Sequence, residues 1–127
     1  MERIVETAIL DQKALEQLRE LDDDGAVLLK IIETFLRDAP NNIATIESAI
    51  ISNDAKTLDR AAHTLKSTSA TLGAMVLSSI CKELEMLGRQ GDLANAKESV
   101  SRVRNEMAAA VAALELETAK ILGVRHA

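Results

Sequence analysis

Residues 61–74 read AAHTLKSTSATLGA, and this stretch places a histidine in the middle of a predicted helix. A helix advances about 100° per residue, so angles around its axis follow from the spacing. The mostly apolar side, about 100–180° from His63, holds Leu58, Ala61, Ala62, Leu65, Thr68, Ser69 and Leu72. The polar or small side, within about 60° of it, holds Lys56, Asp59, Arg60, Lys66, Ser67 and Ala70. The stretch therefore predicts a helix that buries one face and displays His63 on the other.

The composition favours one all-α domain. The chain has 127 residues, of which 47% are hydrophobic, yet it contains one Phe and neither Trp nor Tyr. Its core must therefore be aliphatic. Only five Gly and one Pro interrupt a sequence dominated by strong helix formers. We expect a single domain over residues 1–127, with its core at about 10–116.

The charge and the cysteine count exclude several other classes. A formal net charge of −5 and the lack of a basic, aromatic stripe argue against nucleic-acid binding. No apolar run approaches the roughly 18 residues that span a membrane, and the N-terminus does not resemble a signal peptide. The one cysteine, Cys81, shares an apolar face with leucines and predicts a buried side chain. These features indicate a cytoplasmic protein, and the initial Met favours a free-standing one.

The turn signals divide the chain into two short N-terminal helices and four longer ones. Asp24 and Asp54 are candidate N-caps, and Pro40 suits a first helical turn. Gly88 and Gly91 predict a turn before the last helix. The expected helices are 11–21, 24–37, 40–53, 54–72, 74–87 and 93–121. Short connections predict an antiparallel, up-and-down four-helix bundle, with the two N-terminal helices packed over one end.

The chain resembles the histidine-containing phosphotransfer (HPt) domains of multistep two-component phosphorelays. The residues that carry the resemblance are Phe35-Leu36, Pro40, Asp54, Ala62-His63-Thr64-Leu65-Lys66, Ser69, Leu72-Gly73-Ala74, Cys81, Leu84-Glu85 and Gly88-Arg89-Gln90-Gly91-Asp92. They cover nearly the whole chain, from about Leu10 to Leu116. One departure is Ser67, where many members have Gly after the lysine. Because Ser is also small, access to the imidazole is expected to survive.

The resemblance implies a bacterial phosphorelay intermediate. His63 would accept a phosphoryl group from an aspartyl phosphate on one receiver domain and pass it to another. The expected partners are response-regulator receiver domains and a hybrid sensor kinase, with the chain itself a monomer. A neutral imidazole is available near pH 7 as the nucleophile, and Lys66, one turn later, can meet the phosphate charge. Mg²⁺ would come from the receiver, because the chain lacks a carboxylate cluster or a nucleotide-binding loop of its own.

Several further residues complete the predicted site. The small Ser67, Ala70 and Ala74 would leave a flat approach for a receiver, and Arg60 lies on the same face. Glu85 could orient a ring N–H of His63, and Arg89 could help to hold the phosphate or the partner. An open alternative is that Glu85 pairs with Lys82 or Arg89 in a surface ion network.

Two interpretations of the whole chain therefore remain. The first is the phosphotransfer protein, with no ATP-dependent kinase activity of its own. The second is an all-α adaptor that docks a receiver or kinase without being phosphorylated. A degenerate adaptor is expected to lack the histidine or the lysine, whereas this chain has His63 and Lys66. No role is assigned to His126, and no metal site is predicted.

Overall fold

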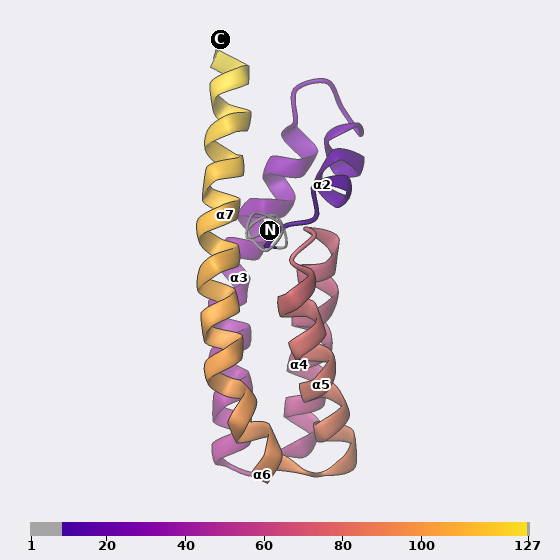
Figure 1. The fold of residues 1–127 in the computed structure, drawn as a ribbon, viewed down its shortest axis with the longest axis vertical. Helices are drawn as coiled ribbons and strands as arrows, with labels where there is room; N and C mark the ends of the chain where they lie inside the picture. The colour runs from indigo at the N-terminus through magenta and orange to yellow at the C-terminus, as the bar shows by residue number, and fades with distance from the viewer. Residues whose placement is uncertain (1–8, 127) are drawn as a thin grey trace, which may run out of the picture.

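The computed structural model describes the backbone of residues 9–126 and the side chains of residues 9–123, and within this range it is helical without a strand. The prediction of an all-α protein is confirmed. The elements are α2 (Gln12–Arg19), α3 (Ala26–Ile51), α4 (Ala55–Thr71), α5 (Met75–Gln90), α6 (Leu93–Ala96), the 3₁₀ turn η1 (Lys97–Ser99) and α7 (Val100–His126). The long helices α3, α4, α5 and α7 lie along the long axis of the molecule (Figure 1).

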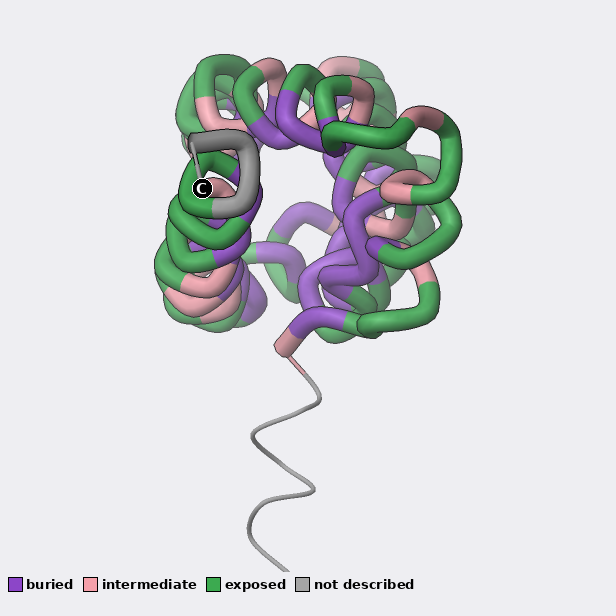
Figure 2. The backbone as a smooth tube through the Cα atoms, turned by 90° about the horizontal axis from the view of Figure 1, so that it is seen from above, coloured by how far each residue is buried: buried purple, intermediate pink, exposed green. Residues whose placement is uncertain are grey.

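The core is aliphatic, as the composition predicts. In the view from above, the buried stretches of the helices face one another across the interior (Figure 2). Side chains with at most 1% exposure come from all four long helices and include Leu28, Ile32, Ile46, Leu58, Leu65, Leu77, Leu84, Val103 and Leu114. Each helix thus buries one apolar stripe, and burial of these stripes from water is the main force that holds the bundle together.

The prediction of separate helices at 24–37 and 40–53 is wrong, because Pro40 lies inside the single helix α3. A proline within a helix removes one backbone hydrogen bond and crowds the carbonyl four residues earlier, here that of Leu36. Pro40 is exposed, so water can reach this part of the backbone. Buried residues on both sides, Phe35 and Ala39 before it and Ile46 after it, follow one continuous apolar stripe. Packing of that stripe outweighs the local cost of the proline.

Gly88 lies within α5, and the prediction that it belongs to the following turn is wrong. A Cβ atom at this position would lie 2.9 Å from the backbone nitrogen of Asp59 and 3.1 Å from the carbonyl oxygen of Ala55. Glycine is therefore required here because the backbones of α4 and α5 approach closely. Gly91, with a φ of 72°, makes the left-handed turn that ends the helix.

The last predicted helix, 93–121, is divided into three segments. Asp92 accepts a hydrogen bond from the backbone N–H of Asn95 and starts the short helix α6. The backbone then tightens into the 3₁₀ turn η1 before α7 begins at Val100. Burial of Leu93, Ala96 and Ser99 holds these short segments against the bundle. The final helix also continues beyond the predicted end at residue 121.

The short helix α2 lies beyond the end of α4 and α5 and beside α3 (Figure 1), so the packing predicted for residues 11–21 at one end of the bundle is confirmed, whereas the second short helix predicted there is the first part of α3. The backbone N–H of Asp11 donates to the carbonyl of Gly73 at 2.8 Å. On the other side, Arg19 donates to the buried carboxylate of Glu117 on α7 at 3.1 Å. These two contacts tie α2 both to the turn between α4 and α5 and to the last helix.

Candidate phosphotransfer site

Helix α4 presents His63 to solvent at the middle of its length. The carboxylate of Asp54 accepts from the backbone N–H of Thr57 at 3.2 Å and caps the start of the helix, as predicted. Leu58 and Leu65 are fully buried on the opposite face. The imidazole of His63 is 57% exposed. The amphipathic pattern of this helix is thus confirmed, except that Thr68 is exposed and donates its hydroxyl to carbonyls within α4.

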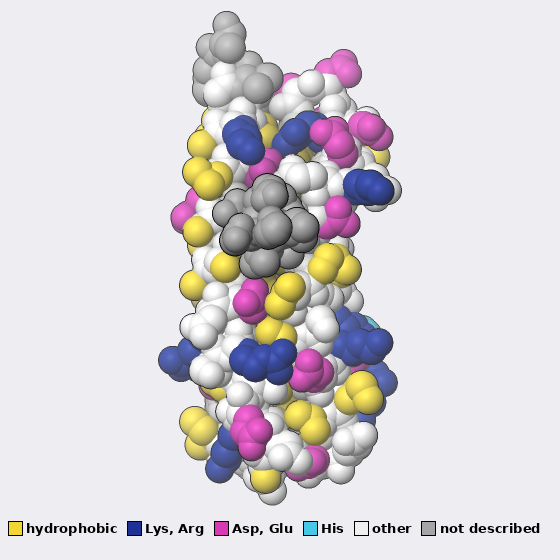
Figure 3. All heavy atoms as spheres, in the orientation of Figure 1, with side chains coloured by type: hydrophobic (Ala, Val, Ile, Leu, Met, Phe, Trp, Pro, Cys, Tyr) yellow, Lys and Arg dark blue, Asp and Glu magenta, His cyan; other side chains and the backbone are white. Residues whose placement is uncertain are grey.

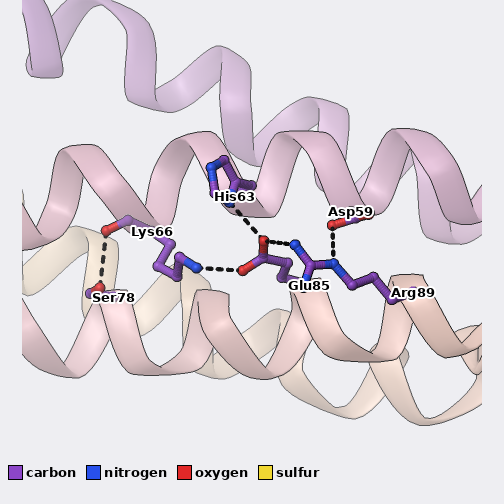
Figure 4. A network of polar contacts seen from close by, with 6 residues as sticks. All are labelled: Asp59, His63, Lys66, Ser78, Glu85 and Arg89. Carbon is purple, nitrogen blue, oxygen red and sulfur yellow. Dashed lines mark hydrogen bonds and ion pairs between the residues drawn. The ribbon is translucent and has the colours of Figure 1, made fainter.

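Glu85 on α5 is the centre of the polar network beneath His63. Its side chain is only 3% exposed, yet three cationic or potentially cationic groups reach it (Figure 4). Nδ1 of His63 lies 2.7 Å from Oε2, and Nζ of Lys66 lies 2.6 Å from Oε1. A terminal guanidinium nitrogen of Arg89 lies 2.7 Å from Oε2. Both oxygens of this buried carboxylate therefore have charged or polar partners, which burial of a charge requires.

This network determines which nitrogen of the imidazole ring carries the hydrogen. The hydrogen bond from Lys66, followed by that from His63, holds the pKa of Glu85 below its ordinary value. Glu85 is therefore an ionised carboxylate near neutral pH and can only accept hydrogen bonds. Nδ1 of His63 must then carry the hydrogen, which leaves the lone pair of the neutral ring on Nε2. The exposed ring thus has its nucleophilic nitrogen defined by a buried partner.

Lys66 and Arg89 approach Glu85 from opposite sides. The Lys66 side chain is 29% exposed and that of Arg89 is 62% exposed, so both cations border the surface. Nε of Arg89 also lies 3.4 Å from Oδ1 of Asp59 on α4. The pairing of Glu85 with Arg89 is thus present, but Glu85 is buried instead of belonging to a surface network, and among the described side chains no hydrogen bond or ion pair joins it to Lys82.

The predicted binding residues divide into two groups. Ser67 and Arg60 are exposed and Ala70 is half-buried, all on the His63 side of α4. Ala74, in contrast, is 1% exposed, so the prediction that it lines the approach to the imidazole is wrong. The reason is the break in the helix: Gly73 adopts a φ of 80°, and helical periodicity cannot be extended beyond it. Ala74 instead enters the core at the start of α5.

The sequence patterns predicted no role for two polar residues that lie near the site. Asp59 lies one turn before His63 and holds Arg89; its place on the same face was a signal for this contact. Ser78 is 8% exposed and donates its hydroxyl to the carbonyl of Lys66 at 2.9 Å (Figure 4). This bond links α5 to the backbone that carries Lys66. The only signal for it in the sequence was a serine among the apolar positions of α5.

A groove of about 470 Å³ lies beside the site, between α3 and α4. Its lining includes Thr64, the neighbour of His63, together with Thr68 from α4 and Ile31, Phe35 and Ala39 from α3. The exposed surface of the lining is mostly apolar, although eight of its twelve residues are polar or charged. The groove thus gives the face that displays His63 a concave, apolar border.

Other possible sites are weak among the described residues. Cys81 is fully buried, as predicted, and this burial raises the pKa of its thiol to about 12, so it is not a thiolate near neutral pH. Residues 9–123 contain no group of three or more His, Cys, Asp or Glu side chains suited to hold a metal ion. In the same part of the chain, no helix has the length and apolar character needed to cross a bilayer.

Comparison with known proteins agrees with the fold. Residues 30–113 match the model of the Hpt domain family, so the chain belongs to this family of phosphotransfer domains. A similar solved structure is histidine-containing phosphotransfer protein B (HptB) from Pseudomonas aeruginosa PAO1. It shares 28% sequence identity with this chain, with a TM-score of 0.82, over 88% of this chain and 96% of the other. No curated protein sequence matches the chain significantly. Membership of the family gives the chain a phosphotransfer role in phosphorelays, where HPt domains interact with receiver domains and kinases.

Proposed function

We propose that His63 accepts a phosphoryl group from the aspartyl phosphate of one receiver domain and then donates it to another receiver. The observation that carries the proposal is the pairing of an exposed imidazole with the buried Glu85 carboxylate at 2.7 Å. An idle surface histidine has no need of such a partner. The hydrogen bond to Glu85 occupies Nδ1 and leaves Nε2 free to react with a group on a partner.

The transfer of the phosphoryl group needs no proton donor. The lone pair of Nε2 attacks phosphorus in line with the aspartyl oxygen, the N–P bond forms and the P–O bond breaks. The aspartate leaves as a carboxylate that keeps the electron pair of the broken bond. The imidazole retains its hydrogen on Nδ1, and the positive charge that develops on the ring faces the negative Glu85. Reversal of the same steps on a second receiver returns the phosphoryl group to an aspartate.

Lys66 is the cation that we assign to the phosphoryl oxygens, and Arg89 is the cation that we expect to stay on Glu85. Both are partly exposed, and both sit on Glu85 in the unphosphorylated protein. A phosphoryl group on Nε2 adds negative charge within one turn of Lys66. We propose that Lys66 then divides its hydrogen bonds between Glu85 and the phosphate. Arg89 keeps the buried carboxylate compensated meanwhile, so the exchange does not leave an unpaired charge.

The receiver would dock over α4, on the small side chains of Ser67 and Ala70 and along the apolar groove beside Thr64. We propose that the chain acts as a monomer in the cytoplasm. Its long helices α3, α4, α5 and α7 would run alternately up and down the bundle. The first phosphoryl donor would be a hybrid sensor kinase. Mg²⁺ for the reaction would be held by the receiver, since metal-ligating carboxylates are expected beside its aspartate.

The test is incubation with a phosphorylated receiver domain, followed by analysis of the label on this chain. We expect the wild type to become labelled by a bond that is lost in acid and survives base, as for an N–P bond. His63→Gln should abolish labelling and leave the helical signal and the melting temperature nearly unchanged, because an exposed side chain contributes little to packing. Labelling of the variant at the wild-type rate would exclude His63 as the acceptor. A folded wild type that binds receivers but is never labelled would indicate an adaptor.

A further inference from the structure

The charge of the molecule is distributed unevenly around His63. The whole chain carries a formal net charge of −5. The faces of α4 and α5 around the imidazole, however, hold five cationic side chains and two carboxylates. The cations are Lys56, Arg60, Lys66, Lys82 and Arg89, and the carboxylates are Asp59 and Glu85. Figure 3 shows Lys and Arg side chains gathered beside the His side chain at the right edge of the molecule.

Three of these cations are not used by the network beneath the ring. Lys66 and Arg89 are paired with Glu85, and Arg89 also with Asp59. Lys56, Arg60 and Lys82 are exposed, and within residues 9–123 no acidic side chain forms an ion pair with them. Asp54 accepts hydrogen bonds from the hydroxyl and the backbone N–H of Thr57, and Arg60 and Lys56 help to lower its pKa through space without forming an ion pair with it. We call Lys56, Arg60 and Lys82 the basic collar.

The collar residues lie on α4 and α5, the two helices that build the site. Lys56 and Arg60 lie about two turns and one turn before His63 on α4, within about 60° of it around the axis. Lys82 lies on α5, one turn before Glu85, which contacts the ring. Exposed cations that serve only solubility would not need to be grouped near one histidine on an acidic protein. A partner that approaches the imidazole must therefore meet the collar.

We infer that the basic collar selects receiver domains whose surface around the phosphorylated aspartate is acidic, and that it accelerates their association. This inference rests on the proposed function. A receiver that holds Mg²⁺ beside an aspartate needs further carboxylates as ligands, so the surface that meets His63 is negative. The three exposed cations of the collar attract such a negative surface over a long range, which speeds the encounter, and they repel receivers with a basic rim. An extended polyanion such as nucleic acid would be repelled by the acidic remainder of this molecule.

The test measures association with an unphosphorylated receiver, so it needs no transfer. The collar variant is Arg60→Glu combined with Lys82→Glu. Its matched control is Lys13→Glu combined with Lys97→Glu, which changes the net charge equally at exposed lysines on α2 and η1. Stopped-flow association rates are recorded for each protein between 50 mM and 1 M salt.

We expect the collar variant to associate about 10-fold or more slowly than the control at 50 mM salt, with a smaller dependence of rate on salt. At 1 M salt, where the Debye length is about 3 Å, the two rates should converge. Equal rates for the two variants at low salt, or a deficit that persists unchanged at 1 M, would overturn the role of the collar. Failure of the proposed function is separate: the wild type would then take no acid-labile label from a phosphorylated receiver.

Discussion

Glu85 makes two kinds of contact at one residue: it bonds the ring of His63, and it holds Lys66, the cation that we propose for the phosphate. Sequence reasoning could place Glu85 beside the histidine from its position in α5. It could not decide between ring orientation and ion pairing, since the angular position of a side chain on one helix does not give its depth against another. With 3% exposure and three partners, the carboxylate serves both.

Replacement of Glu85 by Gln should remove part of the acid sensitivity of the fold. The folded-state pKa of Glu85 is lowered, chiefly by the hydrogen bond from Lys66, so its contribution to stability is fully present above the unfolded pKa of about 4.3. That contribution disappears as the pH falls through the lower folded pKa. Urea denaturation between pH 7 and pH 3 should therefore show a smaller loss of unfolding free energy in Glu85→Gln than in the wild type. Because Glu47 and Asp54 also have lowered pKa values, the difference between the two curves is the measurement.

Lys66→Ala should slow transfer in both directions without preventing it. In the proposed mechanism the lysine stabilises charge on the phosphoryl group but forms no covalent bond, and loss of one such donor typically costs about 10²–10³ in rate in a desolvated site. Since Lys66 is 29% exposed, we expect about 10-fold to 100-fold. Rapid-quench transfer from a labelled receiver measures the rate, with Lys97→Ala as an exposed control. A wild-type rate at low salt would exclude an electrostatic role.

At the scale of the helices, the apolar patterns predicted which residues are buried better than they predicted where helices end. The face of α4 opposite His63 packs as its spacing indicates, apart from Thr68. Pro40 misled the prediction because the local preference of proline for a first turn lost to packing on both sides of it. The opposite error placed Ala74 on the surface, because the left-handed backbone of Gly73 resets the direction of the following side chains. The first outcome depends on tertiary contacts, which local sequence rules do not include. The second arose because the helical spacing was extended beyond residue 72, where the predicted helix ends.

Gly88→Ala should disturb the site through the spacing of α4 and α5. Its Cβ would lie 2.9 Å from the backbone nitrogen of Asp59, and backbone cannot move aside as a flexible side chain can. We expect a loss of about 1–3 kcal/mol in unfolding free energy, as for an overpacked core. Transfer should slow as well, because Asp59 and the helix that carries His63 are displaced.

The control for this prediction is Gly123→Ala. Gly123 also lies in a helix, but a Cβ there meets no atom within 4 Å. This variant should be unchanged or more stable by up to about 1 kcal/mol, since Ala favours helix over Gly. Chemical denaturation of both proteins compares them, and equal stability of Gly88→Ala and the wild type would contradict the close approach of α4 and α5.

At the scale of the whole molecule, the bundle supplies one rigid face for a large partner. Leu58, Leu65 and Leu84 anchor α4 and α5 in the core, so the exposed imidazole stands on a surface that does not rearrange easily. Short side chains at Ser67 and Ala70 continue this face, and the groove between α3 and α4 borders it. Because a receiver must bring its aspartate within bonding distance of Nε2, bulk added to this face should act on the partner before it acts on the chemistry.

Ala70→Trp should therefore block receiver docking sterically. Ala70 lies two turns after His63, about 10 Å along the helix, which is within the footprint of a docked domain. Receiver binding and receiver-dependent transfer should both fall far more than labelling by a small donor such as phosphoramidate, which needs only access to the ring. Ala112→Trp, at an exposed alanine of α7, is the matched control and should bind receivers as the wild type does. Equal receiver titrations for Ala70→Trp and Ala112→Trp would show that partners approach from another direction, because an indole at position 70 cannot be avoided by a domain that covers this face of α4.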